Sequence, residues 1–195
     1  MQEAMASTAL FRRPVLVTPV SPAGSAPARK RVMEAITRRA GDRAVVLLDR
    51  ALPSGGPEAG ALVDLVVAPS GLWVLDARAY DGLVEQRARG GWARGDFRLY
   101  LDGYEQSVLV EDLALRRDAA AAAVGAHRAP VTGALCFVGA EWPLFAKPWR
   151  QGNVWVTWMT PLVKMVAGPG PVSPERVAAL AELAEAALPP AAVAA

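Results

Sequence analysis

The order of apolar and polar positions along the chain predicts a series of short strands between helices. Apolar runs bounded by glycine, proline or polar residues are typical of strands, and apolar positions three or four residues apart are typical of helices. The predicted strands are residues 44–48, 61–68, 72–77, 83–87, 97–101, 131–138 and 154–158. The predicted helices are residues 29–39, residues 107–124 and a last helix after residue 173. This order predicts an α/β fold with a mixed central β-sheet flanked by helices.

The last helix has clear start and stop residues. Ser173 can cap its first turn, and Pro174 fits the first helical position, where no amide hydrogen bond is needed. Pro189 and Pro190 end it. Four of its residues are expected to face the core: Val177, Leu180, Leu183 and Leu188.

The domain organisation follows from where these patterns start. Residues 1–28 are rich in proline, serine and alanine and show no sustained period, so we predict a flexible N-terminal arm. Residues 29–191 are predicted to form one domain, because 195 residues suffice for one full core but are short for two.

The distribution of apolar residues excludes a membrane-spanning helix, since no apolar run approaches the roughly 20 residues that such a helix needs. Near the N-terminus, Pro14, Pro19 and Pro22 interrupt the apolar residues and leave no segment of the length that a signal peptide requires. We therefore expect a cytoplasmic protein with no membrane partner.

The single cysteine and a tryptophan-rich segment both favour packing over chemistry. Cys136 is the only cysteine, which excludes an internal disulfide and a cysteine-based zinc site. It lies in an apolar strand, so we expect a small buried side chain rather than a nucleophile. Four tryptophans lie between residues 142 and 158, and such a cluster is more often packed in the core or in loops than used to stack bases.

Arginine dominates the positive charge. The net charge is only +2, from 21 lysine and arginine residues against 19 aspartate and glutamate residues. Arginines cluster at residues 29–39, 87–98 and 116–117, and guanidinium groups bind phosphates well. A general preference for arginine codons would give the same composition, so charge leaves nucleic-acid binding open.

The hairpin of residues 64–78 carries the most informative acidic residues. A three-residue loop ending in a left-handed glycine would be residues 69–71. Ala68 would then pair with Leu72, and Asp64 would lie directly opposite Asp76.

Two carboxylates that face each other in an apolar sheet need a compensating cation, because like charges repel strongly where water is excluded. Alternation along a strand puts Arg78 on the same face as Asp76 and, in the predicted register, as Asp64. A divalent metal such as Mg²⁺ could bridge the two carboxylates. Alternatively, Arg78 could neutralise them as a structural ion bridge.

The segment from Val63 to Gly82 resembles the signature hairpin of nuclease-related (NERD) domains, a divergent branch of the PD-(D/E)XK nucleases. The matching residues are Val63-Asp64-Leu65, Pro69-Ser70-Gly71 and Leu75-Asp76-Ala77-Arg78, followed by Tyr80 and Gly82. Further matches extend the resemblance over roughly residues 29–191: Leu48–Pro53, Leu109-Val110, Leu135–Leu144 and Leu188–Ala191. The resemblance implies a restriction-endonuclease-like fold.

It also implies roles for individual residues. Asp64 would be the metal-binding aspartate, Asp76 the acidic residue of the (D/E)XK element, and Glu34 the glutamate that the first helix contributes. The implied cofactor is Mg²⁺ or Mn²⁺, bound by these three carboxylates. The implied reaction is hydrolysis of phosphodiester bonds, in DNA rather than RNA, by a water molecule that the metal activates.

The sequence departs from the family pattern at three positions. Arg78 stands where the family has lysine, Leu65 where it has histidine, and Arg116 near a frequent glutamine. Arginine can hold a phosphate, but with a pKa above about 12 it cannot accept a proton from water. The implied function is therefore a weakened metal-dependent nuclease in which Arg78 takes the place of the lysine.

Two alternatives stay open. One is a non-catalytic module that binds nucleic acid or a protein partner, and the other is a structural module whose carboxylates only pair with Arg78. In either nucleic-acid hypothesis, Arg87, Arg89, Arg94 and Arg98 would follow a phosphate backbone if they lie beside the acidic residues.

Overall fold

The computed structural model describes residues 25–53, 58–88, 97–125 and 129–191. The helices are α1 (Ser25–Ala40), α2 (Ser107–Val124), α3 (Met159–Val166) and α4 (Pro174–Ala187), with the short 3-10 helix η2 (Gly41–Arg43). The first strands are β1 (Val45–Ala51), β2 (Leu62–Ala68), β3 (Gly71–Ala79) and β4 (Val84–Ala88). The remaining strands are β5 (Phe97–Leu101), β6 (Tyr104–Glu105), β7 (Val131–Val138), β8 (Trp149–Gln151) and β9 (Val154–Trp158).

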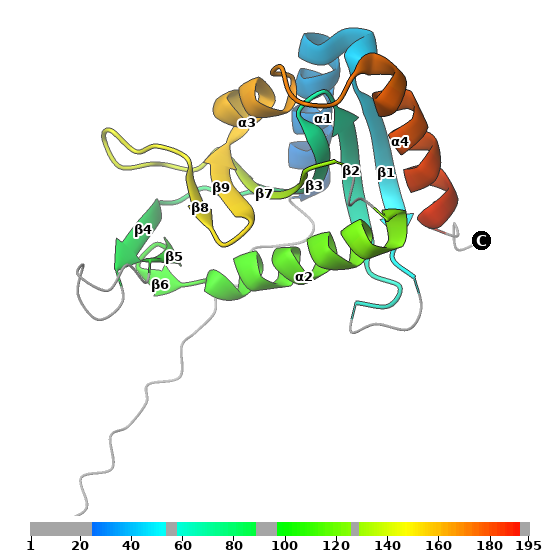
Figure 1. Ribbon diagram of the computed structural model, residues 1–195. Helices are drawn as coiled ribbons and strands as arrows, with labels where there is room; N and C mark the ends of the chain where they lie inside the picture. Colours follow the sequence, from blue (N-terminus) through cyan, green and yellow to red (C-terminus); the bar gives the residue numbers. More distant parts are fainter. Residues whose placement is uncertain (1–24, 54–57, 89–96, 126–128, 192–195) are drawn as a thin grey trace, which may run out of the picture.

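Six strands form one mixed sheet in the order β1-β2-β3-β7-β9-β8 (Figure 1). The β3–β7 and β7–β9 pairs are parallel, and the β1–β2, β2–β3 and β8–β9 pairs are antiparallel. Strands β4, β5 and β6 form a separate small antiparallel sheet. The predicted mixed sheet flanked by helices is confirmed.

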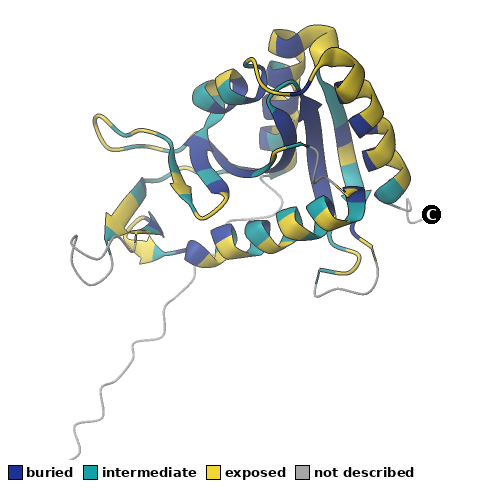
Figure 2. Cartoon of the chain, in the orientation of Figure 1, coloured by how far each residue is buried: buried dark blue, intermediate teal, exposed yellow. Residues whose placement is uncertain are grey.

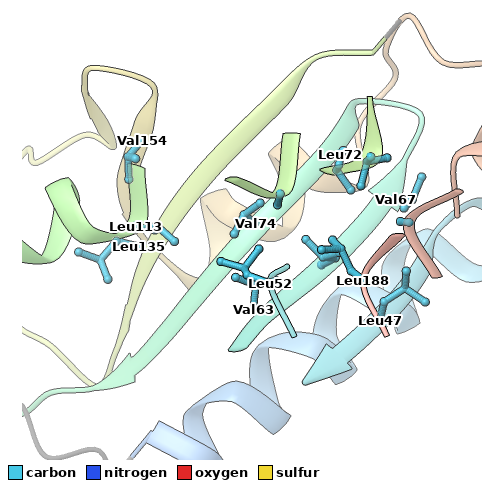
Figure 3. Close-up of a cluster of buried hydrophobic side chains, with 14 of the residues drawn as sticks. Leu47, Leu52, Val63, Val67, Leu72, Val74, Leu113, Leu135, Val154 and Leu188 are labelled. Carbon is cyan, nitrogen blue, oxygen red and sulfur yellow. The ribbon is translucent and has the colours of Figure 1, made fainter. Parts of the chain in front are cut away.

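Each face of the large sheet packs against two helices. Residues of α2 and α4, such as Leu113 and Leu180, join the cluster that contains Leu65 and Val74. Figure 3 shows Leu113 and Val74 within this cluster. Residues of α1 and α3 join the cluster on the other face, which contains Trp73 and Leu75. Burial on both faces explains why the central strands are continuous apolar runs (Figure 2). Among the described helices, none is long and apolar enough to cross a membrane.

Several predicted features are confirmed at the level of single residues. Ser173 caps α4, since its side chain accepts a hydrogen bond from the Arg176 amide, and Pro174 is the first helical residue. Three of the four clustered tryptophans pack together: the centre of the Trp142 ring lies 4.9 Å from that of Trp158 and 5.7 Å from that of Trp149. Trp155 packs on the other face of the sheet.

The only cysteine is fully buried between the sheet and the helices α1 and α3. Cys136 is 0% exposed and belongs to the same cluster as Trp73. Burial raises the pKa of its thiol to about 12. The predicted burial of this side chain among apolar residues is confirmed.

Other predictions need correction. Helix α1 begins at Ser25, inside the predicted arm, and Ala28 is buried in the core. Residues 1–24 lie outside the described residues. Leu183 was expected to face the core but is 56% exposed, because Leu180 and Ala184 fill the buried stripe of α4.

Strand β1 forms one edge of the large sheet, and only part of that edge is covered. The Ala51 amide donates to Pro189 (2.9 Å), and the Ala191 amide donates to the Asp49 carbonyl (2.8 Å). The segment after α4 therefore lies along the end of β1. No described segment forms such backbone bonds with the outer edge at residues 45–48.

Candidate functional site

The hairpin has a register that differs by one residue from the predicted one. Ala68 pairs with Gly71, and Asp64 pairs with Leu75 instead of Asp76. Since side chains alternate along a strand, the one-residue shift puts Asp64 and Asp76 on opposite faces of the sheet. The prediction that the two carboxylates face each other is wrong.

Gly71 explains the shift. It was expected to end a three-residue loop, but it is the first residue of β3 and leaves a loop of only two residues. Its φ of +128° disfavours a side chain, and a Cβ atom there would lie 2.4 Å from the Pro130 carbonyl oxygen. Glycine is needed at this position because the chain that leads into β7 passes so close.

Asp64 points toward α1 and lies beside Arg29 there. It is 8% exposed, accepts a hydrogen bond from the Asp49 amide (3.1 Å) and lies 3.5 Å from Nε of Arg29. Burial raises the pKa of Asp64, while the Asp49 amide and the charge of Arg29 act in the opposite direction. Desolvation therefore dominates at this carboxyl group.

Arg29 also holds Asp49. Its two terminal nitrogens donate to the two carboxylate oxygens of Asp49 at 2.6 and 2.9 Å. This bidentate pairing lowers the pKa of Asp49 and raises that of Arg29. Asp49 has a φ of +50° at the irregularity where β1 shifts register against β2, and this bulge turns its amide toward Asp64.

Asp76 lies on the other face, in a network with two arginines. Arg78 donates to it from Nε (3.1 Å) and Nη2 (2.8 Å), and Nη2 of Arg116 lies 3.4 Å from the same oxygen. Arg116 also contacts Asp112, four residues earlier in α2. Two guanidinium groups thus balance two carboxylates. Arg78 is a structural ion bridge to Asp76, but it does not reach Asp64.

Glu34 is not close to either aspartate. It is exposed on α1 and lies 3.9 Å from the Lys30 amino group. Among the described residues, no three histidine, cysteine, aspartate or glutamate side chains are grouped so that they could hold a metal ion. The expected metal-binding set of Asp64, Asp76 and Glu34 is therefore not brought together.

The arginines that were expected to follow a phosphate backbone are also paired where they are described. Arg87 contacts Glu85 and lies over the Tyr100 ring, 5.2 Å from its centre. Arg98 lies 3.1 Å from Glu111. Arg89 and Arg94 lie outside the described residues.

Sequence reasoning missed a second charged region, which we name the basic end: Arg38, Arg39, Arg43 and Lys164. All four side chains are exposed, and none contacts a carboxylate within the part of the chain that the structure describes. Arg39 of α1 and Lys164 of α3 line the same shallow pocket. The arginine run was visible in the sequence, but α3 was not predicted, so the contribution of Lys164 was not foreseen.

The basic end and the acidic residues lie at opposite ends of the sheet. Arg38 and Arg39 are in the last turn of α1, next to the start of β1. Arg29, which holds Asp49 and Asp64, precedes Arg39 by ten residues, or roughly 15 Å along a helix. The Ser70 hydroxyl donates to the Val166 carbonyl (2.7 Å), which fixes the end of α3 beside the β2–β3 turn.

The arrangement thus separates exposed cations at one end of the sheet from carboxylates at the other, and each of these carboxylates lies beside an arginine. Comparison of the chain with known protein families, with curated proteins and with solved structures gave no match.

Proposed function

We propose that this chain binds nucleic acid through the basic end and does not hydrolyse it. The observation that carries the proposal is the exposure of Arg38, Arg39, Arg43 and Lys164, which contact no carboxylate among the described residues. Cations that pair with no carboxylate can bind phosphates and release the counterions of a nucleic acid.

The local geometry supports phosphate binding. Arg43 donates from Nε to the Ala40 carbonyl (3.2 Å) and from Nη2 to the Arg39 carbonyl (3.5 Å), so its guanidinium group is oriented at the end of α1. A helix C-terminus by itself favours nearby cations. Lys164 lies likewise in the last turn of α3, and it lines the same pocket as Arg39, so two helix C-termini bring their cations together here.

The state of the acidic residues argues against hydrolysis. Metal-assisted hydrolysis needs carboxylates that converge on one ion. Asp64 pairs in register with Leu75, so it points away from Asp76, and each of the two carboxylates already has an arginine partner. Arg78 cannot act as a base, because its guanidinium group stays protonated.

The proposal is tested by fluorescence anisotropy with a labelled oligonucleotide of about 20 nucleotides over a salt series. We expect binding at low salt that weakens as salt rises. A plot of the logarithm of the binding constant against the logarithm of the salt concentration should have a slope of about −3 if all four cations contact phosphates. Arg39→Gln should reduce the slope by about 1. Lys147→Gln, which removes an exposed charge on the β7–β8 loop, should leave the slope unchanged.

Two results would contradict the proposal. One is the absence of binding at about 20 mM salt, where phosphate contacts are strongest. The other is an equal change of the salt slope in Arg39→Gln and Lys147→Gln, since binding would then depend on total charge and not on the basic end.

The second candidate function is the metal-dependent nuclease that the resemblance to NERD domains implies. One observation favours it: Asp64 and Asp76 lie on adjacent strands, because Asp64 pairs with Leu75, the neighbour of Asp76. Incubation of plasmid DNA with the protein and Mg²⁺ or Mn²⁺ tests this candidate. Cleavage that Asp76→Ala abolishes would establish a nuclease, and we expect none.

A further inference from the structure

A groove runs beside the basic end, between α1 and the uncovered part of β1. It has a volume of about 770 Å³, within the range of ligand-binding clefts. Seven of its lining residues matter here: Lys30, Met33, Glu34, Thr37 and Arg38 of α1, and Val46 and Leu48 of β1.

The groove combines an apolar floor with a charged rim. Met33, Val46 and Leu48 supply the apolar surface, and Leu48 is 40% exposed although it is a large hydrophobic residue. Lys30 and Arg38 supply positive charge at the rim. Arg38 also belongs to the basic end, so the groove and the phosphate-binding surface are continuous.

We propose that the groove receives unpaired bases of a single-stranded nucleic acid whose phosphates lie on the basic end. This inference rests on the proposed function and names its substrate class. A base presents a flat apolar face to Met33 and Leu48, and the guanidinium plane of Arg38 can stack on it. In a duplex the bases are stacked inside, so they cannot enter a groove on the protein surface.

The polar residues of the groove distinguish a base from an acidic peptide, the other polyanion that the cations would attract. Glu34 lines the groove and can accept hydrogen bonds from the amino groups of a base. The same carboxylate would repel the side chains of an acidic peptide. Thr37 adds a hydroxyl group that can donate or accept.

Anisotropy with three probes tests the inference on the unmodified protein. The probes are a single-stranded DNA of mixed sequence, the duplex of the same sequence, and an abasic strand of the same length. We expect the single strand to bind about tenfold more tightly than either the duplex or the abasic strand at the same salt concentration.

A matched pair of uncharged variants tests the groove itself. Leu48→Gln removes part of the apolar floor at an exposed position of β1, and Leu183→Gln makes the same change at an exposed position of α4. We expect Leu48→Gln to bring the affinity for the single strand close to that for the abasic strand. Leu183→Gln should bind as the unmodified protein does.

The outcomes separate this inference from the proposed function. Equal binding of all three probes would leave nucleic-acid binding standing and overturn the groove as a base-binding site. If Leu48→Gln and Leu183→Gln lost the same affinity for the single strand, the groove as a base-binding site would also be overturned. Binding of none of the probes would overturn both proposals. Unlabelled poly-glutamate and unlabelled single strand can also be compared as competitors of the labelled single strand. Equal displacement by the two would show that the groove selects negative charge only, and would overturn the inference.

Discussion

The arginines at the two ends of the sheet differ in what they contact. Arg29, Arg78 and Arg116 each pair with an aspartate that the sheet or the β1 bulge positions. Arg38 and Arg39 are exposed and contact no carboxylate among the described residues. Arginine thus compensates buried negative charge at one end of the sheet, whereas at the other end it stays available to a binding partner.

This difference shows why a count of arginines says little about nucleic-acid binding. The Arg78 and Asp76 side chains are 19% and 13% exposed, so their pairing offsets the cost of removing a carboxylate from water. An arginine in such a pair would have to leave that carboxylate before it could bind a phosphate. Only unpaired arginines contribute charge without that penalty.

The largest expected effect on stability comes from Arg29→Met. The variant leaves the buried Asp64 without its cation, and loss of one partner of a buried pair destabilises strongly. Because Arg29 is partly exposed, we expect a loss of about 2–3 kcal/mol in the free energy of unfolding. Urea denaturation followed by circular dichroism measures it.

Arg39→Met is the matched control at the basic end. It makes the same substitution on the same helix at an exposed position, and it should change stability by less than about 0.5 kcal/mol. If both variants lost the same free energy, the contrast between paired and available arginines would be incorrect.

Arg78→Lys should have a smaller effect. Lysine cannot reproduce the fork by which Nε and Nη2 both reach Asp76, so we expect a loss of about 1 kcal/mol. The variant should not cleave plasmid DNA with Mg²⁺ or Mn²⁺. Cleavage that appears in Arg78→Lys and disappears when Asp76→Ala is added would show that the lysine alone was missing from a competent nuclease site.

The smallest expected effect is on the way stability depends on pH in the acid range. The pKa of Asp49 lies below its ordinary value of 3.8 because of Arg29, so the stability from this pair is present above that pH and is lost below it. The pKa of Asp64 is raised by burial, so its ionised form costs stability and takes up a proton at higher pH than usual.

Both carboxyl groups therefore need Arg29 less as the pH falls. The difference in stability between the unmodified protein and Arg29→Met should shrink from about pH 5 to about pH 3. Denaturation curves of both proteins over this range measure it. A difference that stays constant would mean that Arg29 acts through packing of its alkyl chain and not through its charge.

The bounds of several elements could be predicted from the sequence. Those predicted for α2, β7 and β9 are the ones observed. The left-handed Gly125 ends α2, and β7 and β9 are mainly apolar runs. Helix α3 was missed because it has only eight residues and follows β9 directly, without a turn between them. The apolar residues of α3 do lie on one face, but no turn residue marks where the strand ends and the helix begins.

The candidate site could be predicted only in part. Alternation along β3 correctly put Asp76 and Arg78 on one face. The face that Asp64 occupies depends on whether the hairpin loop has two residues or three. The loop has two because Gly71 belongs to β3, where the Pro130 carbonyl approaches it closely. The pairing of Arg29 with Asp49 and Asp64 links a helix to a bulge, and no local pattern encodes that contact.

The buried Cys136 has a practical consequence. The sequence contains no other cysteine, and this thiol is fully buried with a pKa of about 12, so thiol reagents will not modify the folded protein. A cysteine introduced at an exposed position, such as Thr37 in the groove or Thr160 on α3, would be the one reactive thiol. A fluorophore or spin label attached there would report on a single place, with no background cysteine to remove first.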